Sequence, residues 1–121
     1  MPLAGLDHVQ LAMPAGQEDA ARRFYRDLLG LVEMAKPAPL VASGGVWFAL
    51  GEQQLHLGVE ADFRPAKKAH PAFRVTDIAA LRRQLIAAGE SPIDDHALPG
   101  YDRFYLNDPF GNRLEFLERT R

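Results

Sequence analysis

The amino-acid sequence predicts an α+β fold made of two βαβββ modules in tandem, at residues 5–60 and 69–118 of one domain covering residues 1–121. Three observations predict this fold class. The order strand, helix, strand, strand, strand occurs twice, at a repeat distance of about 60 residues. Each copy combines one helical pattern with several alternating patterns. Apolar residues make up 47% of the chain, which is enough to bury a core.

Residues 6–13 are predicted to form the first strand, because polar and apolar side chains alternate there. Alternate residues of a strand point to opposite faces of its sheet. Val9 and Leu11 therefore share one face, which we expect to pack against a helix. His8 and Gln10 share the other face.

Residues 17–29 are predicted to form the helix of the first module. Apolar residues recur there at about one helical turn, with arginines opposite them. These apolar residues are Ala20, Ala21, Phe24 and Leu28. Gly30 is expected to end the helix, because glycine readily adopts the left-handed conformation common at helix C-termini.

Three more strands complete the first module, at residues 31–35, 46–50 and 53–59. Proline and glycine favour a loop at residues 37–45. The last two strands are close in sequence, so a tight turn at Gly51 and the following residue is expected to join them.

The second module follows a polar, proline-containing linker at residues 62–69. Residues 70–75 repeat the alternation of the first strand. Asp77 can cap the N-terminus of a second helix. The apolar face of that helix is made of Ile78, Leu81, Leu85 and Ala88. Gly89 is expected to end it.

A short strand near residues 92–93 and a final hairpin complete the second module. The hairpin joins residues 101–106 to residues 113–117. Its turn, residues 108–112, contains the proline and glycine that turns favour.

The repeat places residues of metal-binding type at matching positions. His8 and His70 stand on the first strands of the two modules, and His56 and Glu115 stand on the last strands. The two spacings are similar, at 48 residues in the first module and 45 in the second. Packing of the modules about a pseudo-twofold axis would bring these four side chains into one cleft. The sequence therefore predicts a shared site to which each module gives two ligands.

The chain contains no cysteine, so a metal would be held by nitrogen and oxygen ligands. Neutral imidazole and carboxylate suit a divalent transition ion, namely Zn, Ni, Co, Mn or Fe. His8, His70 and Glu115 alone would form the two-histidine, one-carboxylate arrangement of non-heme iron oxygenases. Whether His56 joins them is left open, because a histidine on a strand is also a common surface or packing residue.

Three further residues are candidates for contact with a substrate. Gln10 lies on the expected cleft face, and Arg103 and Tyr105 share one face of the strand that precedes Glu115. Each has a plainer interpretation as a polar or packing residue. Glu115 itself could form an ion pair with Arg103 or with Arg113.

Four motifs carry a resemblance to a known family. They are DHV at residues 7–9, FYRDLLGL at residues 24–31, HPAF at residues 70–73 and DPFGNRLEF at residues 108–116. Together they resemble the vicinal oxygen chelate superfamily, also called the glyoxalase/bleomycin-resistance/dioxygenase fold, over nearly the whole chain. The resemblance implies paired βαβββ modules, a curved mixed sheet that forms a cleft, and usually a homodimer. It also implies metal ligands at His8, His56, His70 and Glu115.

The resemblance suggests roles for single residues. The residue that matches Glu115 in glyoxalase I binds the metal and leaves it to act as a base, and a tyrosine that matches Tyr105 lines the pocket in fosfomycin-type relatives. The sequence also departs from both groups. His56 stands where glyoxalase I usually has a carboxylate, and Gln10 stands where fosfomycin transferases have threonine.

The function expected from these residues is that of a small, metal-dependent, glyoxalase-like enzyme. It would bind a bidentate oxygen substrate and act by lyase, isomerase or dioxygenase chemistry. The alternative is a non-catalytic antibiotic-resistance protein of the bleomycin-resistance type, which binds a drug in the dimer cleft. A family member that binds metal without turning over a substrate is a third possibility.

Charge and hydropathy narrow the range of partners. The formal net charge is −2 with acids and bases mixed, which gives no reason to expect nucleic acid or an anionic membrane as a partner. No apolar run approaches the roughly 18–20 residues of a membrane span. The first residues lack the pattern of a secretion signal. We therefore expect a cytoplasmic protein whose partner is a small-molecule substrate.

Overall fold

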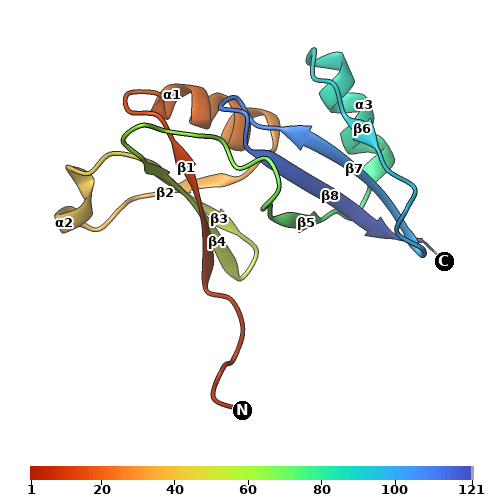
Figure 1. Cartoon of the computed structure of the whole chain (residues 1–121), viewed down its shortest axis with the longest axis horizontal. Helices are drawn as coiled ribbons and strands as arrows, with labels where there is room; N and C mark the ends of the chain where they lie inside the picture. The colour runs from red at the N-terminus through yellow and green to blue at the C-terminus, as the bar shows by residue number, and fades with distance from the viewer. Residues whose placement is uncertain (121) are drawn as a thin grey trace. The chain divides into compact units, whose positions relative to one another are not determined.

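The computed structural model describes residues 1–120, which form two compact units. The first unit is Met1–Pro65 and the second begins at Ala66 (Figure 1). The boundary falls inside the segment, residues 62–69, that the sequence marks as a linker. Each unit has its own sheet and helices.

The first unit contains a four-stranded sheet with the order β1-β4-β3-β2. The strands are β1 (His8–Met13), β2 (Val32–Met34), β3 (Val46–Leu50) and β4 (Gln53–Val59). β1 runs parallel to β4, and the other neighbours are antiparallel. The predicted bounds of β3 and β4 are confirmed, whereas β1 begins two residues later than predicted.

The second unit repeats this topology with the order β5-β8-β7-β6. The strands are β5 (Ala72–Arg74), β6 (Ile93–Asp94), β7 (Tyr101–Asn107) and β8 (Arg113–Arg119). β5 runs parallel to β8, and the other neighbours are antiparallel, as in the first unit. Matching order and direction in both sheets confirm the predicted repeat and the α+β fold class. β5 is shorter than predicted, so His70 precedes the strand.

The first helix is irregular where the sequence predicts a continuous α-helix. The α-helix α1 (Glu18–Ala21) continues as the π-helix η1 (Arg22–Leu28). Phe24 and Tyr25 are both buried, and the ring of Tyr25 packs against that of Phe48 at 5.6 Å. Neighbouring residues of an α-helix point about 100° apart, so the wider turn of a π-helix helps two consecutive aromatic side chains reach one core.

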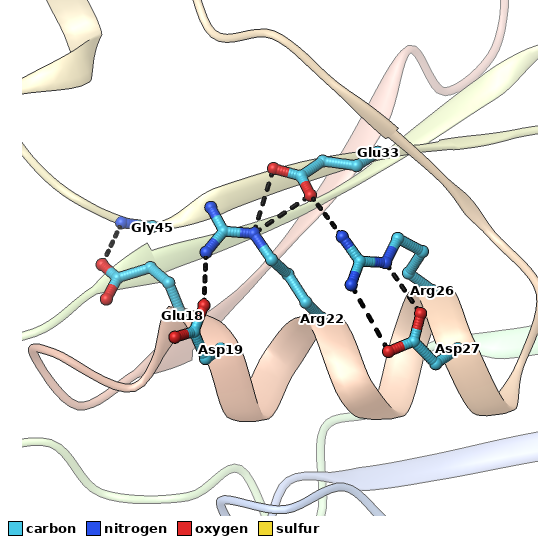
Figure 2. Close-up of polar contacts among 7 residues, drawn as sticks. All are labelled: Glu18, Asp19, Arg22, Arg26, Asp27, Glu33 and Gly45. Carbon is cyan, nitrogen blue, oxygen red and sulfur yellow. Dashed lines mark hydrogen bonds and ion pairs between the residues drawn. The ribbon is translucent and has the colours of Figure 1, made fainter.

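Salt bridges and hydrogen bonds fasten this helical segment to the sheet (Figure 2). Nε of Arg22 donates to both carboxylate oxygens of Glu33 on β2, at 3.0 and 3.1 Å, and Arg26 reaches the same carboxylate. The carboxylate of Glu18 accepts the backbone N–H of Gly45 at 2.9 Å. The helix is therefore bound to β2 and to the start of β3.

The other helices follow their local sequence signals. The turn α2 (Ala38–Val41) corrects the expectation of a loop throughout residues 37–45. Pro37 precedes it with φ fixed at −55°, and proline is well tolerated at a helix start. The predicted second helix is α3 (Ile78–Ala87), and the side chain of Asp77 caps it by accepting the N–H of Ala80 at 3.1 Å.

The turn between β7 and β8 is held by buried polar side chains. The carboxylate of Asp108 accepts the backbone N–H groups of Phe110 and Asn112, both at 2.9 Å. The amide of Asn112 donates to Asp108 at 3.0 Å and accepts the backbone N–H of Ala66, also at 3.0 Å. Backbone N–H of Arg113 donates to the carbonyl of Ala66 at 2.8 Å. The DPFGN segment thus ties the start of the second unit to its final hairpin.

Candidate functional site

The first pair of candidate ligands lies on neighbouring strands of the first unit. Gln10 is the register partner of His56 across β1 and β4, so His8 lies on the same face one pleat away. The rings of His8 and His56 are stacked with centroids 4.3 Å apart. The ring of Trp47 stacks on the other side of His56 at 3.8 Å. The three rings therefore form a continuous stack across β1, β4 and β3.

The two histidines have different surroundings. His56 is buried, and its Nε2 is 2.8 Å from the side-chain oxygen of Gln54. Burial lowers the pKa of His56, and a positive charge on His8 lowers it further. The side chain of His8 is 45% exposed, and its Nδ1 is 2.9 Å from the carboxylate of Asp7. A neutral imidazole at His56 is the form in which histidine binds metals.

Gln10 occupies the same sheet face beside these rings. Its side-chain amide lies over Gly58, where a Cβ would approach the amide nitrogen to 2.5 Å. The absence of a side chain at Gly58 therefore makes room for Gln10. Alternation along β1 correctly places Gln10 on this face.

The second pair of candidate ligands lies in the second unit and is in direct contact. Nε2 of His70 is 2.9 Å from a carboxylate oxygen, Oε1, of Glu115 on β8. Nδ1 of His70 donates to the backbone carbonyl of Lys68 at 2.7 Å. A carbonyl only accepts, so the Nδ1–H points at Lys68 and Nε2 is the ring nitrogen that faces the carboxylate. A proton or a metal cation can occupy the position between Nε2 and the carboxylate oxygen.

Arg103 holds the other side of the Glu115 carboxylate. Its guanidinium donates to Oε2 of Glu115 at 3.2 Å and to Asp95 at 3.0 Å. The hydrogen bonds to Asp95 and then to Glu115 raise the pKa of Arg103 above its ordinary value. The pKa of Asp95 is lowered, first by the backbone N–H of Ala97 and then by Arg103. Glu115 is therefore a buried carboxylate fixed between His70 and a permanent cation.

Tyr105 stands next to this pair. It is the register partner of Glu115, and its ring meets the ring of His70 edge to face at 5.4 Å. The guanidinium carbon of Arg103 lies 5.3 Å from the Tyr105 ring centroid, and that of Arg113 lies 3.8 Å from it. Of the two arginines considered as partners of Glu115, the structure selects Arg103 and leaves Arg113 on the tyrosine.

The structure brings the candidate residues together in two groups, one per unit. His8, His56 and Gln10 share one face of the first unit's sheet. Glu115, Arg103 and Tyr105 share one face of the second unit's sheet, where His70 contacts Glu115. Sequence reasoning missed three neighbours: Gln54, the backbone carbonyl of Lys68 and Asp95. Strand alternation signals Gln54, two residues before His56. No comparable signal identifies the Lys68 carbonyl or Asp95, which depend on loop conformation.

Within residues 1–120, no three histidine, aspartate or glutamate side chains gather as a set that could hold a metal. The four expected ligands divide two and two between the units. The donor chemistry of the second pair fits a divalent ion. Two ligands bound to one ion at about 2.0–2.2 Å and at a right angle lie about 3 Å apart, which is close to the His70–Glu115 separation. Metal-bound histidines usually donate their other N–H to a carbonyl, as His70 does.

No helix within the described part of the chain has the length and apolar character needed to cross a bilayer. This finding agrees with the hydropathy of the sequence.

The sequence and structure were compared with known proteins. The family model for a glyoxalase-like domain matches residues 10–117. No curated protein matches the chain. A crystal structure assigned to a glyoxalase family protein of Bacillus anthracis is 51% identical, with a TM-score of 0.96, and the match covers 98% of this chain and 97% of the other.

Two more distant structures share the fold. Lactoylglutathione lyase from Agrobacterium tumefaciens is 26% identical with a TM-score of 0.76, and the match covers 98% of this chain and 96% of the lyase. A glyoxalase/dioxygenase from Nostoc punctiforme is 22% identical with a TM-score of 0.80, and the match covers 99% and 94% of the two chains. With the family match over most of its length, this chain belongs to the glyoxalase-like domain family of the vicinal oxygen chelate superfamily.

Proposed function

We propose that this protein is a small metal-dependent enzyme of the glyoxalase type, acting on a substrate with two neighbouring oxygen atoms. The observation that carries the proposal is the contact between His70 and Glu115. Each partner forms a second hydrogen bond through its other polar atom. His70 bonds through Nδ1 to the Lys68 carbonyl, and Glu115 bonds through Oε2 to Arg103. Such supporting hydrogen bonds orient metal ligands and fix their protonation states.

The proposed ligands are His8 and His56 from the first unit and His70 and Glu115 from the second. Their nitrogen and oxygen donors suit Zn, Ni, Fe, Mn or Co. A bound ion of this kind would supply Lewis acidity toward a substrate carbonyl or hydroxyl. We further propose that the protein is a homodimer, which leaves the two halves of the site to come from one chain or from two.

Glu115 is the proposed catalytic base. A carboxylate can take a proton from a carbon next to a carbonyl and return it elsewhere, which is the step common to lyase and isomerase chemistry on such substrates. Oε1 is the proposed atom for this exchange, because Arg103 binds Oε2 while Oε1 faces Nε2 of His70. Arg103 would keep the carboxylate in one orientation during the transfer, and the ring of Tyr105 would line the substrate side of the pair.

Gln10 is proposed as a substrate contact from the first unit. Its amide offers both a donor and an acceptor on the face that carries His8 and His56. The bound metal would decide between the two kinds of chemistry. A dioxygenase requires a redox-active ion such as iron, whereas lyase or isomerase chemistry does not.

A metal titration tests the proposal. The chelator-treated chain, titrated with Co²⁺ and followed by visible absorption, should bind about one ion per chain with nitrogen and oxygen ligands. His70→Ala and Glu115→Gln should each weaken binding about tenfold or more. His96→Ala, which changes an exposed loop histidine, is the matched control and should bind as the wild type does. Equal affinity in all four proteins would refute the ligand assignment.

The stack of aromatic rings favours a second candidate function. The stacked rings of Trp47, His56 and His8 end on the half-exposed imidazole surface of His8. A non-catalytic drug-binding protein would use such a surface to stack on an aromatic ligand. Tight binding of a planar aromatic antibiotic by metal-free protein, abolished by Trp47→Ala and unchanged by Glu115→Gln, would support this alternative over the enzyme.

A further inference from the structure

Arg113 differs from Arg103 and Glu115, the other charged residues on its face of the second sheet, because it forms no ion pair within residues 1–120. It lies on β8 two residues before Glu115, so the two side chains share one face of the sheet. Its register partner is Asn107, and Tyr105 lies next to Asn107 on the same face. Arg113 is half-buried, and its guanidinium carbon lies 3.8 Å from the centroid of the Tyr105 ring.

The charges around Arg113 are already balanced without it. Arg103 is shared between Asp95 and Glu115, so both of those carboxylates have a cationic partner. Among residues 1–120, Arg113 forms no ion pair. A half-buried cation with no anionic partner has a free capacity for one.

The contact with Tyr105 prepares this guanidinium to bind an oxyanion. The guanidinium carbon of Arg113 lies over the Tyr105 ring, 3.8 Å from its centroid, which is within the range of a cation–π contact. Its N–H donors are at the edges of the plane and remain available for a bidentate contact. Because the side chain is already held by the ring, less rotational freedom is lost when an anion binds.

We propose that Arg113 anchors an oxyanion of the substrate, a carboxylate or a phosphonate, beside the His70–Glu115 pair. The ring of Tyr105 separates the anchor from His70, with centroid contacts of 3.8 Å to Arg113 and 5.4 Å to His70. The anionic group would therefore lie on the face of β8 that carries Glu115, two residues along the strand. The substrate class is a small 2-oxo or 2-hydroxy acid or its phosphonate counterpart. This proposal rests on the proposed function for the role of His70 and Glu115, but the anion contact itself requires no metal.

The test uses the full chain after chelator treatment, so that metal binding does not contribute. Pyruvate, methylphosphonate and the neutral ester methyl pyruvate are titrated separately, with the arginine Nε–H signals followed by nuclear magnetic resonance. The variants are Arg113→Gln and Arg113→Lys. Arg83→Gln removes an exposed arginine of α3 in the same unit and is the matched control.

Pyruvate or methylphosphonate should shift the Arg113 signal in a saturable manner, and the tighter of the two identifies the oxyanion. The dissociation constant should rise about tenfold or more in Arg113→Gln, as expected for a lost hydrogen bond to a charged group. The dissociation constant of Arg113→Lys should lie between those of the wild type and Arg113→Gln, because lysine keeps the charge and loses the bidentate geometry. Methyl pyruvate should produce no saturable shift, and Arg83→Gln should resemble the wild type.

Three results would overturn the proposal: no anion binds the wild type, the ester binds as well as the acid, or Arg113→Gln binds as the wild type does. If circular dichroism shows that Arg113→Gln is unfolded, Arg113→Lys decides the question. Co²⁺ binding is measured on the same samples. If the wild type binds no Co²⁺, the metal site is refuted while the anion result still stands. Failure of the proposed function and failure of the anion site are therefore distinguishable.

Discussion

Neighbouring groups orient the candidate site residues of the second unit, and the sequence predicts only some of these neighbours. His70 depends on the Lys68 carbonyl, and Glu115 depends on Arg103. Strand alternation predicts that Arg103, Tyr105 and Glu115 share a face, and the register of β7 and β8 confirms it. It does not predict which arginine reaches the carboxylate, because that choice depends on side-chain rotamers and on Asp95 from a loop.

The buried imidazole of His56 makes stability depend on pH. Its pKa is lower in the folded chain than in the unfolded chain, whose ordinary value is about 6.5. The unfolded state therefore binds more protons as the pH falls below about 6.5, and the folded state loses stability until the pH is below the lowered pKa. At higher pH both states are neutral and the residue adds no pH dependence.

Replacing His56 by glutamine should remove this component. The urea midpoint of metal-free wild type should fall more steeply than that of His56→Gln as the pH drops below about 6.5. His96→Gln, a change at an exposed position, should keep the wild-type slope. If the urea midpoint depends on pH equally in the wild type and in His56→Gln, burial of the His56 ring does not cause the loss of stability at low pH.

At the scale of elements, local signals set most boundaries. The N-cap at Asp77 and the positive φ angles of Gly30 and Gly89, 82° and 88°, agree with the predicted helix ends. The π-helical turn and the short helix α2 were not predicted. Both arise from context, the first from two adjacent buried aromatic residues and the second from a proline that starts one turn. Turn and helix propensities alone do not contain that information.

The β7–β8 turn offers a test of the DPFGN motif as a structural element. Asn112 is fully buried and joins Asp108 to the backbone of Ala66. Asn112→Ala leaves those partners unsatisfied and should lower the free energy of unfolding by about 1–3 kcal/mol. Asn107→Ala, at an exposed position near the same turn, should change it by less than about 0.5 kcal/mol. Urea denaturation measures both, and equal losses would mean that the motif does not hold the turn.

The start of β3 requires a residue without a side chain. Gly45 has φ of 87°, and a Cβ there would overlap the carbonyl oxygen of Leu57. Gly51 also has positive φ, 58°, but has open space around it. Gly45→Ala should therefore be less stable than Gly51→Ala by about 1–3 kcal/mol, the typical cost of overpacking. Similar unfolding midpoints for the two variants would show that the strand shifts to admit the methyl group.

At the scale of the whole molecule, the repeat is the feature that the sequence predicts best. Both sheets have the same strand order and directions, so matching sequence positions have matching structural roles. His8 and His56 meet in one unit as His70 and Glu115 meet in the other. The contacts differ because the first pair stacks its rings, with Trp47 added, whereas the second pair faces a carboxylate. A difference of this kind follows from side-chain packing, which the repeat alone does not specify.

The central proposal is that the His70–Glu115 pair binds a metal ion. A crystal structure of the metal-loaded protein, with anomalous data collected at the absorption edge of the added metal, tests it most directly. The account predicts one anomalous peak per site, with imidazole nitrogens and the Glu115 carboxylate at about 2.0–2.2 Å. A peak bound elsewhere, with no contact to His70 or Glu115, would contradict it.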